Sequence, residues 1–496
     1  NMIRVSIIIL LLLFGCVEKK SQNKISPEIN KPNIVLIFMD DLGYGDLTPF
    51  GATGYQMPHI SKLANEGMLF TNFYSVQAVC SASRAALLTG CYPNRIGISG
   101  ALMPYSKIGL HEKEITIAEL LKGKGYSTGI FGKWHLGFQK KFLPLNHGFD
   151  SYLGIPYSND MWPVDFDGNQ ISDTSNWKKK SYPQLPLIED FEKIDEIKTL
   201  DDQAKLTTLY TEKSIEFINN NKNNPFFLYL PHSMPHVPIA VSEKFKGKSV
   251  QGLYGDLMME IDWSVGEIIK TLKKNNLENN TLVIFTSDNG PWLNFGNHAG
   301  STGGLREGKG TSFEGGQRVP TIMKWPKVIP SGSISNKITA TIDILPTIAK
   351  IVSSKLPDHK IDGVDILPIL EGNMKSNPRN HLYYYYGKNN LEAIRKDNWK
   401  LVFSHKSRSY KNVLPGNDGH PGLYSEIIAD YALYNLRRDP GEEYDVQDLY
   451  PSIVKELENL AEIARIDLGD NLNDRKGDNV REPGRINYPN WLISTI

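Results

Sequence analysis

Residues 32–41 read Pro-Asn-Ile-Val-Leu-Ile-Phe-Met-Asp-Asp and carry the clearest architectural signal in the chain. An apolar run rich in β-branched residues lies between Pro32 and two aspartates. A strand formed by this run would have no polar face. Such a run is typical of a strand that is buried on both sides. We therefore expect a strand over Asn33–Met39, with Asp40 and Asp41 at its carboxyl end.

Similar apolar runs alternate with helical patterns along the chain that follows. Thr116 and Glu119 form a capping box that opens a short helix, which Gly123 ends. Apolar residues within 257–272 recur at helical spacing and predict an amphipathic helix. Further strands are expected at 127–131, 226–230 and 281–286. This alternation predicts an α/β domain with a large, mostly parallel sheet flanked by helices.

The alternating strand and helix patterns give way near Gly372 to short aromatic runs. These runs predict strands at 382–386, 399–403 and 433–436, and a helical stretch follows at 453–463. We expect a large domain over 32–372 and a smaller α+β domain with an antiparallel sheet over 373–496. Two polar segments, 165–202 and 404–426, are expected to be long surface loops, which serve either as functional rims or as disordered segments.

The first residues resemble an export signal. Arg4 precedes an apolar run over 5–14, which is too short to span a bilayer, and Gly15-Cys16 then resembles a bacterial lipobox. We expect a signal peptide over 1–16 with lipidation of Cys16, followed by a polar linker over 17–31. The alternative is a plain signal peptide cut nearby. Either way the mature protein is exported, as an outer-membrane lipoprotein or a periplasmic protein, and the anchor is its expected membrane contact.

Composition narrows the classes of function. The 496 residues are 40% hydrophobic, which excludes wholesale disorder. Fifty-five Lys and Arg balance 55 Asp and Glu, so no nucleic-acid partner is expected. Three cysteines allow at most one internal bridge and exclude a disulfide scaffold.

Hard oxygen ligands follow two of the predicted strands. Asp40 and Asp41 end one strand, and Asp288 and Asn289 end another. Ligands of open α/β sheets bind beyond the carboxyl ends of the strands. Carboxylate and amide oxygens suit Ca²⁺ or Mg²⁺. Either pair alone is common as a cap or turn, and it is their joint placement that favours a metal site.

The segment 80–90 combines a cysteine with a predicted helix. If the helix begins just after Cys80, the cysteine lies at a positive helix terminus, which favours an anion. Arg84 lies four residues on and shares that helical face. From the residues alone, a buried structural cysteine is still the commoner explanation.

Cys80-Ser81-Ala82-Ser83-Arg84 resembles the maturation motif of the formylglycine-dependent sulfatases, whose cysteine is oxidised to an aldehyde by a dedicated maturation enzyme. Family segments are also matched, in the expected order, by residues 125–137, 225–238, 308–316 and 433–442. The arylsulfatase A-like type is most similar. The resemblance implies an alkaline-phosphatase-like fold and hydrolysis of sulfate esters, with a sulfated polysaccharide or oligosaccharide as the expected substrate. Many members have proline where Ala82 stands, which leaves open which maturation enzyme acts.

The resemblance also implies roles for individual residues. Formylglycine made from Cys80 supplies the nucleophile as its hydrate, and one Ca²⁺ is held by Asp40, Asp41, Asp288, Asn289 and the modified Cys80. Asp288 is also a candidate to help deprotonate the nucleophile. Cys91 is expected to remain a structural thiol.

The resemblance also implies which residues transfer protons and which supply positive charge. Arg84 and Lys133 match residues that stabilise the hydrated aldehyde and the sulfate, and His135 matches the base for sulfate release. His236 matches the leaving-group position, with His232 as the alternative. Sulfate contacts are also implied for Lys309, which would assist the leaving oxygen, and for Ser158.

Two other functions remain open at this point. Phosphate-ester hydrolases of the same superfamily use a serine or threonine and two zinc ions, which the histidine-poor acid pairs fit less well than one hard cation. An inactive carbohydrate-binding surface protein would require the loss of a site residue, and every matched position is filled by an acceptable one.

Overall fold

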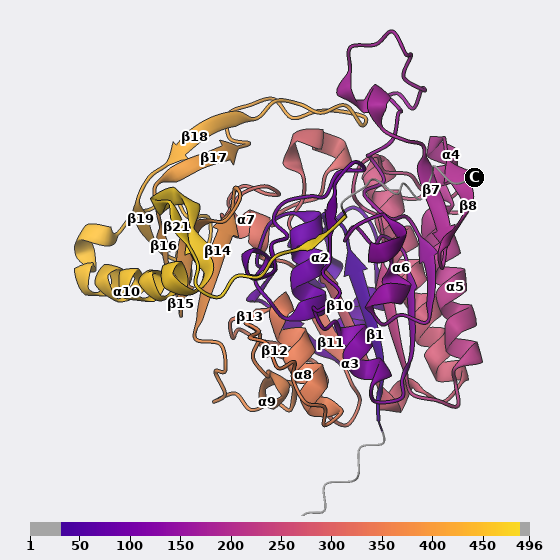
Figure 1. Cartoon of the computed structure of the whole chain (residues 1–496), viewed down its shortest axis with the longest axis horizontal. Helices are drawn as coiled ribbons and strands as arrows, with labels where there is room; N and C mark the ends of the chain where they lie inside the picture. The colour runs from indigo at the N-terminus through magenta and orange to yellow at the C-terminus, as the bar shows by residue number, and fades with distance from the viewer. Residues whose placement is uncertain (1–30, 487–496) are drawn as a thin grey trace, which may run out of the picture. The chain divides into compact units, whose positions relative to one another are not determined.

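A ten-stranded sheet forms the centre of the structure, a computed structural model that describes residues 31–486 (Figure 1). The strand order is β12-β2-β11-β10-β1-β9-β5-β6-β7-β8. In chain order the strands are β1 (Asn33–Met39), β2 (Met68–Phe70), β5 (Ser127–Phe131), β6 (Ser151–Gly154), β7 (Leu185–Glu189), β8 (Glu192–Ile197), β9 (Phe226–Pro231), β10 (Thr281–Ser287), β11 (Thr321–Lys324) and β12 (Ser333–Ser335).

The middle of this sheet is parallel. β1 pairs with β10 on one side and with β9 on the other, and β5 pairs with β9 and β6, all in parallel. The register places Met39 opposite Ser287, so the acidic residues that follow β1 and β10 leave the sheet at the same edge. Antiparallel strands flank this centre, β11 on one side and the β7–β8 hairpin on the other.

Hydrophobic cores cover both faces of the sheet. Every residue of β1 is buried, and its alternating side chains enter two different cores, with Val35, Ile37 and Met39 in one of them. One core is closed by α1 (Pro58–Glu66), α5 (Leu206–Asn220) and α6 (Gly252–Lys274), and the other by α2 (Cys80–Thr89), α3 (Ile117–Lys122) and α8 (Ile344–Ile351). Burial on both faces is the reason that the central strands read as continuous apolar runs.

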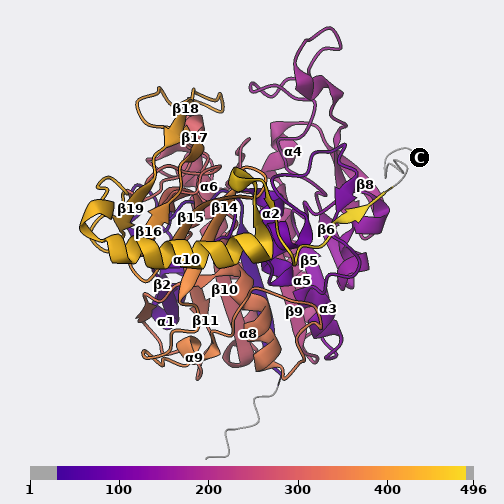
Figure 2. The same ribbon diagram turned by 60° about the vertical axis from the view of Figure 1, so that its left-hand side comes forward.

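A second, four-stranded antiparallel sheet is built from the C-terminal part of the chain. It has the order β14-β15-β16-β19, and the helix α10 packs across it (Figure 2). The elements are β14 (His381–Tyr386), β15 (Asn390–Lys396), β16 (Trp399–Val402), β19 (Ala432–Asn435) and α10 (Pro451–Leu468). The predicted fold class, a mostly parallel α/β sheet with a smaller antiparallel C-terminal part, is therefore confirmed. The boundary at 372/373 stays a prediction.

The prediction of loops over 165–202 and 404–426 was wrong in part, because each segment contributes strands. The first forms the β7–β8 hairpin, whose β7 has buried apolar residues over 185–188 that join it to the main sheet. The second supplies β17 (His405–Ser409), which pairs with β18 (Ser425–Ala429) in a separate two-stranded sheet. β17 alternates buried residues with more exposed ones, whereas β7 is a short buried run, and in both cases the polar composition of the surrounding segment concealed the strand.

The predicted signal, the lipidation site Cys16 and the linker, apart from its last residue Lys31, lie outside the described residues. Within 31–486, no helix is both long and apolar enough to cross a membrane.

Candidate active site

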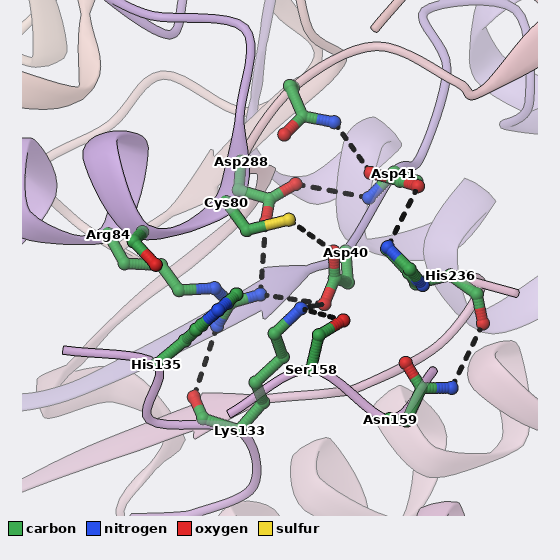
Figure 3. Close-up of polar contacts among 12 residues, drawn as sticks. Asp40, Asp41, Cys80, Arg84, Lys133, His135, Ser158, Asn159, His236 and Asp288 are labelled. Carbon is green, nitrogen blue, oxygen red and sulfur yellow. Dashed lines mark hydrogen bonds and ion pairs between the residues drawn. The ribbon is translucent and has the colours of Figure 1, made fainter. Parts of the chain in front are cut away.

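The carboxyl ends of four adjacent parallel strands converge on one site (Figure 3). Asp40 and Asp41 follow β1, Asp288 follows β10, Lys133 follows β5 and His236 lies in the loop after β9. The approach is close: a Cβ added to Gly132, whose φ is +144°, would lie 2.0 Å from the carbonyl oxygen of Pro231. Glycine is therefore required where the chain leaves β5 beside the end of β9.

Cys80 is the first residue of α2, with Val79 as the N-cap and Gly90, in the left-handed conformation, ending the helix. The thiol is 2% exposed, and its Sγ lies 3.7 Å from Asp40 Oδ1 and 3.4 Å from Lys309 Nζ. The helix thus begins at Cys80 itself, one residue earlier than the start considered from the sequence. The helix dipole and Lys309 both favour negative charge at this point.

Two buried cations hold Asp40 and Asp288. Arg84 Nη2 lies 3.1 Å from Asp40 Oδ2 and 3.0 Å from Asp288 Oδ2, and none of the three side chains is exposed. Lys133 Nζ donates to Asp40 Oδ2 and, at 3.1 Å, to Ser158 Oγ. Arg84 also donates to the Lys133 carbonyl oxygen, at 3.1 Å, which links the helix to the loop after β5.

A second group surrounds Asp41. Lys309 Nζ lies 2.7 Å from Asp41 Oδ1, and His236 Nε2 lies 3.6 Å from Asp41 Oδ2. The ring of Trp292 packs against both residues, with its centroid 5.7 Å from that of His236 and 4.9 Å from Lys309 Nζ. Asn289 Nδ2 donates to Asp41 Oδ1 at 2.7 Å.

The two strand-end carboxyls ionise differently. Burial raises the pKa of Asp40, but Lys133, Arg84 and other cations outweigh it and hold that pKa below its ordinary value. Burial, together with the negative charge of Asp40, raises the pKa of Asp288 to about 7. Burial likewise raises the pKa of the Cys80 thiol to about 12. At neutral pH the thiol is therefore protonated.

The donor set fits a hard cation. Ligand atoms of Asp40, Asp41, Cys80 and His236 all lie within 4.8 Å of one another. Asn289 Oδ1 is buried and has no hydrogen-bond partner among the described residues. An unpartnered buried oxygen is costly, and a cation beside it would satisfy it. Asp288 is engaged differently, since Oδ1 accepts from the Asp41 amide at 3.0 Å and Oδ2 from Arg84.

Of the three histidines considered from the sequence, His135 and His236 lie at the site, and His232 lies away from it. His135 Nε2 lies 2.9 Å from the Leu102 carbonyl oxygen, and its Nδ1 is buried without a partner among the described residues. Burial, followed by the charges of Lys133 and Arg84, lowers the pKa of His135 well below its ordinary value, so the ring is neutral. His232 instead contacts Ser264 of α6 at 3.1 Å, and burial lowers its pKa to about 3. This geometry favours His236 over His232 as the residue that faces the acidic site.

A family model described as Sulfatase matches residues 32–354 of the chain. The chain belongs to the sulfatase family. A second model, described as the C-terminal region of N-sulphoglucosamine sulphohydrolase, matches residues 308–465 of this sulfatase. The mouse N-acetylgalactosamine-6-sulfatase is 37% identical over 441 residues, which cover 83% of this chain and 81% of the relative. Human arylsulfatase A is 35% identical over 450 residues, covering 86% and 87%. The protein is thus a sulfuric ester hydrolase.

Solved structures agree with this assignment. PsFucS1 sulfatase from Pseudoalteromonas sp. superposes with a TM-score of 0.78 at 29% identity, covering 88% of this sulfatase and 90% of that chain. Ps i-CgsB, solved in complex with k-i-k-neocarrahexaose, gives a TM-score of 0.71 at 27% identity, covering 87% and 92%.

Sequence reasoning missed several residues that support the site of this sulfatase. Trp292 had no motif to mark it, and it packs on His236 and Lys309. Asn159 Nδ2 donates to the His236 carbonyl oxygen at 3.2 Å. Tyr410 OH donates to the Lys309 carbonyl oxygen at 2.9 Å from the segment predicted to be a loop. Of these residues, only Asn159 could have been suspected from the sequence, because it directly follows the predicted sulfate contact Ser158.

Proposed function

We propose that this sulfatase acts on sulfated carbohydrate, using a formylglycine made from Cys80 and one bound Ca²⁺. The observation that carries the proposal is the position of Cys80: its Sγ lies at a buried helix N-terminus, within 3.7 Å of Asp40 and 3.4 Å of Lys309. In the modified residue an aldehyde oxygen takes the place of Sγ. An unmodified thiol with a pKa near 12 is a poor nucleophile, whereas the hydrated aldehyde supplies a hydroxyl that can attack sulfur.

Asp40, Asp41 and Asn289 are the residues that we propose hold the cation, with the modified Cys80 and Asp288 completing the set. The unpartnered Asn289 Oδ1 and the acid-rich donor set support this assignment. Bound Ca²⁺ would polarise the sulfate and the nucleophile. Lysine and arginine surround the same carboxylates, so the centre can accept an anionic ester despite its acids.

Proton transfers are assigned to the two histidines of the site. His236 and Lys309 contact the same carboxylate, Asp41, on one side of Cys80, and we propose that they protonate and stabilise the leaving alcohol oxygen. We propose His135 as the base during sulfate release. Its ring is neutral, and its Nδ1 has no hydrogen-bond partner in the described part of the chain. Arg84, Lys133 and Ser158 would hold the nucleophile and the sulfate in line.

A carbohydrate substrate is supported by the relatives, one of which is named for N-acetylgalactosamine 6-sulfate chemistry and another solved with a carrageenan-type oligosaccharide. We also propose that the protein is exported, either anchored through Cys16 or free in the periplasm, and that a formylglycine-generating enzyme converts it. The pattern of Arg4 and the apolar run 5–14 supports export.

Turnover of 4-nitrophenyl sulfate and of 4-nitrophenyl phosphate by protein coexpressed with a formylglycine-generating enzyme tests this proposal. We expect sulfate-ester hydrolysis that is lost on chelation, restored by Ca²⁺ and absent in Cys80→Ala. Faster hydrolysis of the phosphate ester, or full activity of Cys80→Ala, would overturn the mechanism.

A further inference from the structure

A cavity of about 420 Å³ adjoins the site on the side of His236. Val237 and Pro238, which directly follow His236, line it, and so does Trp292, which packs on His236 and Lys309. Its other walls come from residues 160–179, 294–298 and 418–424, with Leu200, Ile239 and Leu253 completing the lining. The cavity therefore lies where the part of a substrate beyond the leaving oxygen would extend.

The two segments that were predicted to be long surface loops, 165–202 and 404–426, meet at this cavity. His420 Nε2 lies 2.8 Å from Asp167 Oδ1, and its ring centroid lies 5.7 Å from that of Phe166. Asp418 and Asn297 exchange two hydrogen bonds of 2.8 Å. Figure 1 shows the long connection between β17 and β18 reaching the segment that precedes β7. These contacts give the cavity a wall built from distant parts of the chain.

Aromatic rings form part of the apolar lining, beside aliphatic side chains. Phe166 and Trp177 lie 4.9 Å apart, and Trp292 and Phe295 form a second pair, also 4.9 Å apart. Lys179 Nζ lies 5.5 Å from the Phe166 ring centroid and 5.2 Å from that of Trp177, which holds these two rings by cation–π contact. Trp177 is half-buried, so part of its surface remains open to a ligand.

Unpartnered polar atoms belong to the residues around these rings. Among the described residues that line the cavity, three have a buried atom without a hydrogen-bond partner: Asp160 Oδ1, Trp292 Nε1 and Asn294 Oδ1. Burial raises the pKa of Asp160, but the charges of His236 and Lys179 outweigh it, so the carboxyl is ionised. The residues thus offer two acceptors and one donor beside aromatic surface. Leaving such atoms unpaired costs free energy that a ligand with both donors and acceptors would recover.

We propose that this cavity binds a pyranose ring of a sulfated oligosaccharide, next to the ring that carries the ester. A pyranose has apolar C–H faces for the aromatic rings and hydroxyls at its edge that both donate and accept. A simple aryl group would fill the apolar space but would leave Asp160 Oδ1 and Asn294 Oδ1 unpaired. The inference rests on the proposed function and deepens it, because it makes the substrate an oligosaccharide rather than a monosaccharide or an aryl ester.

The test compares the full-length converted protein with Trp177→Ala and Asp160→Asn on two kinds of substrate. The probes are hexasaccharides and monosaccharides from chondroitin 6-sulfate and κ-carrageenan, and 4-nitrophenyl sulfate. The matched control is Trp263→Ala, since Trp263 is also half-buried under a lysine ammonium, at 4.4 Å, but does not line the cavity.

We expect kcat/KM to be higher for a hexasaccharide than for its sulfated monosaccharide. Each cavity variant should lower the ratio of hexasaccharide to 4-nitrophenyl sulfate kcat/KM by about tenfold, and the control should not. An unchanged ratio in both variants, or turnover of the aryl ester with no preference for any hexasaccharide, would overturn the inference alone. No turnover of any probe by protein whose Cys80 carries the aldehyde would overturn the proposed function itself.

Discussion

Replacing Arg84 by methionine removes the cation that two buried carboxylates share. The Arg84 guanidinium lies 3.1 Å from Asp40 and 3.0 Å from Asp288, and all three side chains are fully buried. Breaking a buried ion pair by removing one partner costs about 3–5 kcal/mol, because the remaining charge has neither water nor a counter-ion. Lys133 still holds Asp40 in the variant, so most of the cost is expected at Asp288.

The cost should depend on pH. Asp288 has an ordinary pKa of 3.8 and a folded-state pKa raised to about 7, first by burial and then by Asp40. A carboxyl with a raised folded pKa binds its proton more tightly when folded, so its contribution to stability is lost as pH rises from about 4 to 7. Removing Arg84 raises that pKa further. The variant should therefore lose more stability at pH 8 than at pH 5.5.

Urea unfolding in the presence of a chelator, followed by tryptophan fluorescence, measures this loss. The matched control is Arg485→Met, whose partner Glu482 lies 2.9 Å away with 62% and 75% of the two side chains exposed. Such a surface pair is worth about 1 kcal/mol or less. The reasoning is refuted if, at pH 8, Arg84→Met destabilises the protein no more than Arg485→Met does. Added Ca²⁺ should restore part of the stability of the Arg84 variant.

Three further outcomes follow from the site. Asp288→Ala should lower both Ca²⁺ affinity, measured by calorimetry, and sulfate release; unchanged metal binding would remove Asp288 from the ligand set. His236→Ala should slow turnover by about 10²–10⁴-fold, most for esters of weakly acidic alcohols, whereas His232→Ala should mainly lower stability; the reverse order would exchange their roles. Because the pKa of the buried Cys80 thiol is about 12, unconverted protein should resist iodoacetamide at pH 8 until it is unfolded, and rapid alkylation of the native protein would contradict that burial.

The central sheet was predictable because burial on both faces leaves a direct mark on the sequence. β1, β9 and β10 are largely apolar runs, and the predicted capping box at Thr116 opens α3 as expected. β7 and β8 were not found, because β7 is a short buried run inside a long polar segment and β8 is largely solvated, so the composition of the whole segment is that of a loop. Pairing across the sheet, with β10 beside β1, is a long-range choice that no local pattern encodes.

The site was predictable where residues lie at strand ends or within a short motif. Asp40, Cys80 and Lys133 follow such local signals, and the structure brings them within contact of common partners. Trp292 and Tyr410 were not predictable, because they act through packing on Lys309 from distant segments. The same applies to the cavity beside His236, whose walls meet only in the folded chain.

The mass of the peptide that contains Cys80, taken from protein made in the native organism, shows directly whether the nucleophile is a formylglycine. We expect that the thiol sulfur has been lost and replaced by an aldehyde oxygen, and that a hydrazide reagent captures the same peptide. A peptide that retains an unmodified cysteine in protein that still releases sulfate would contradict this expectation.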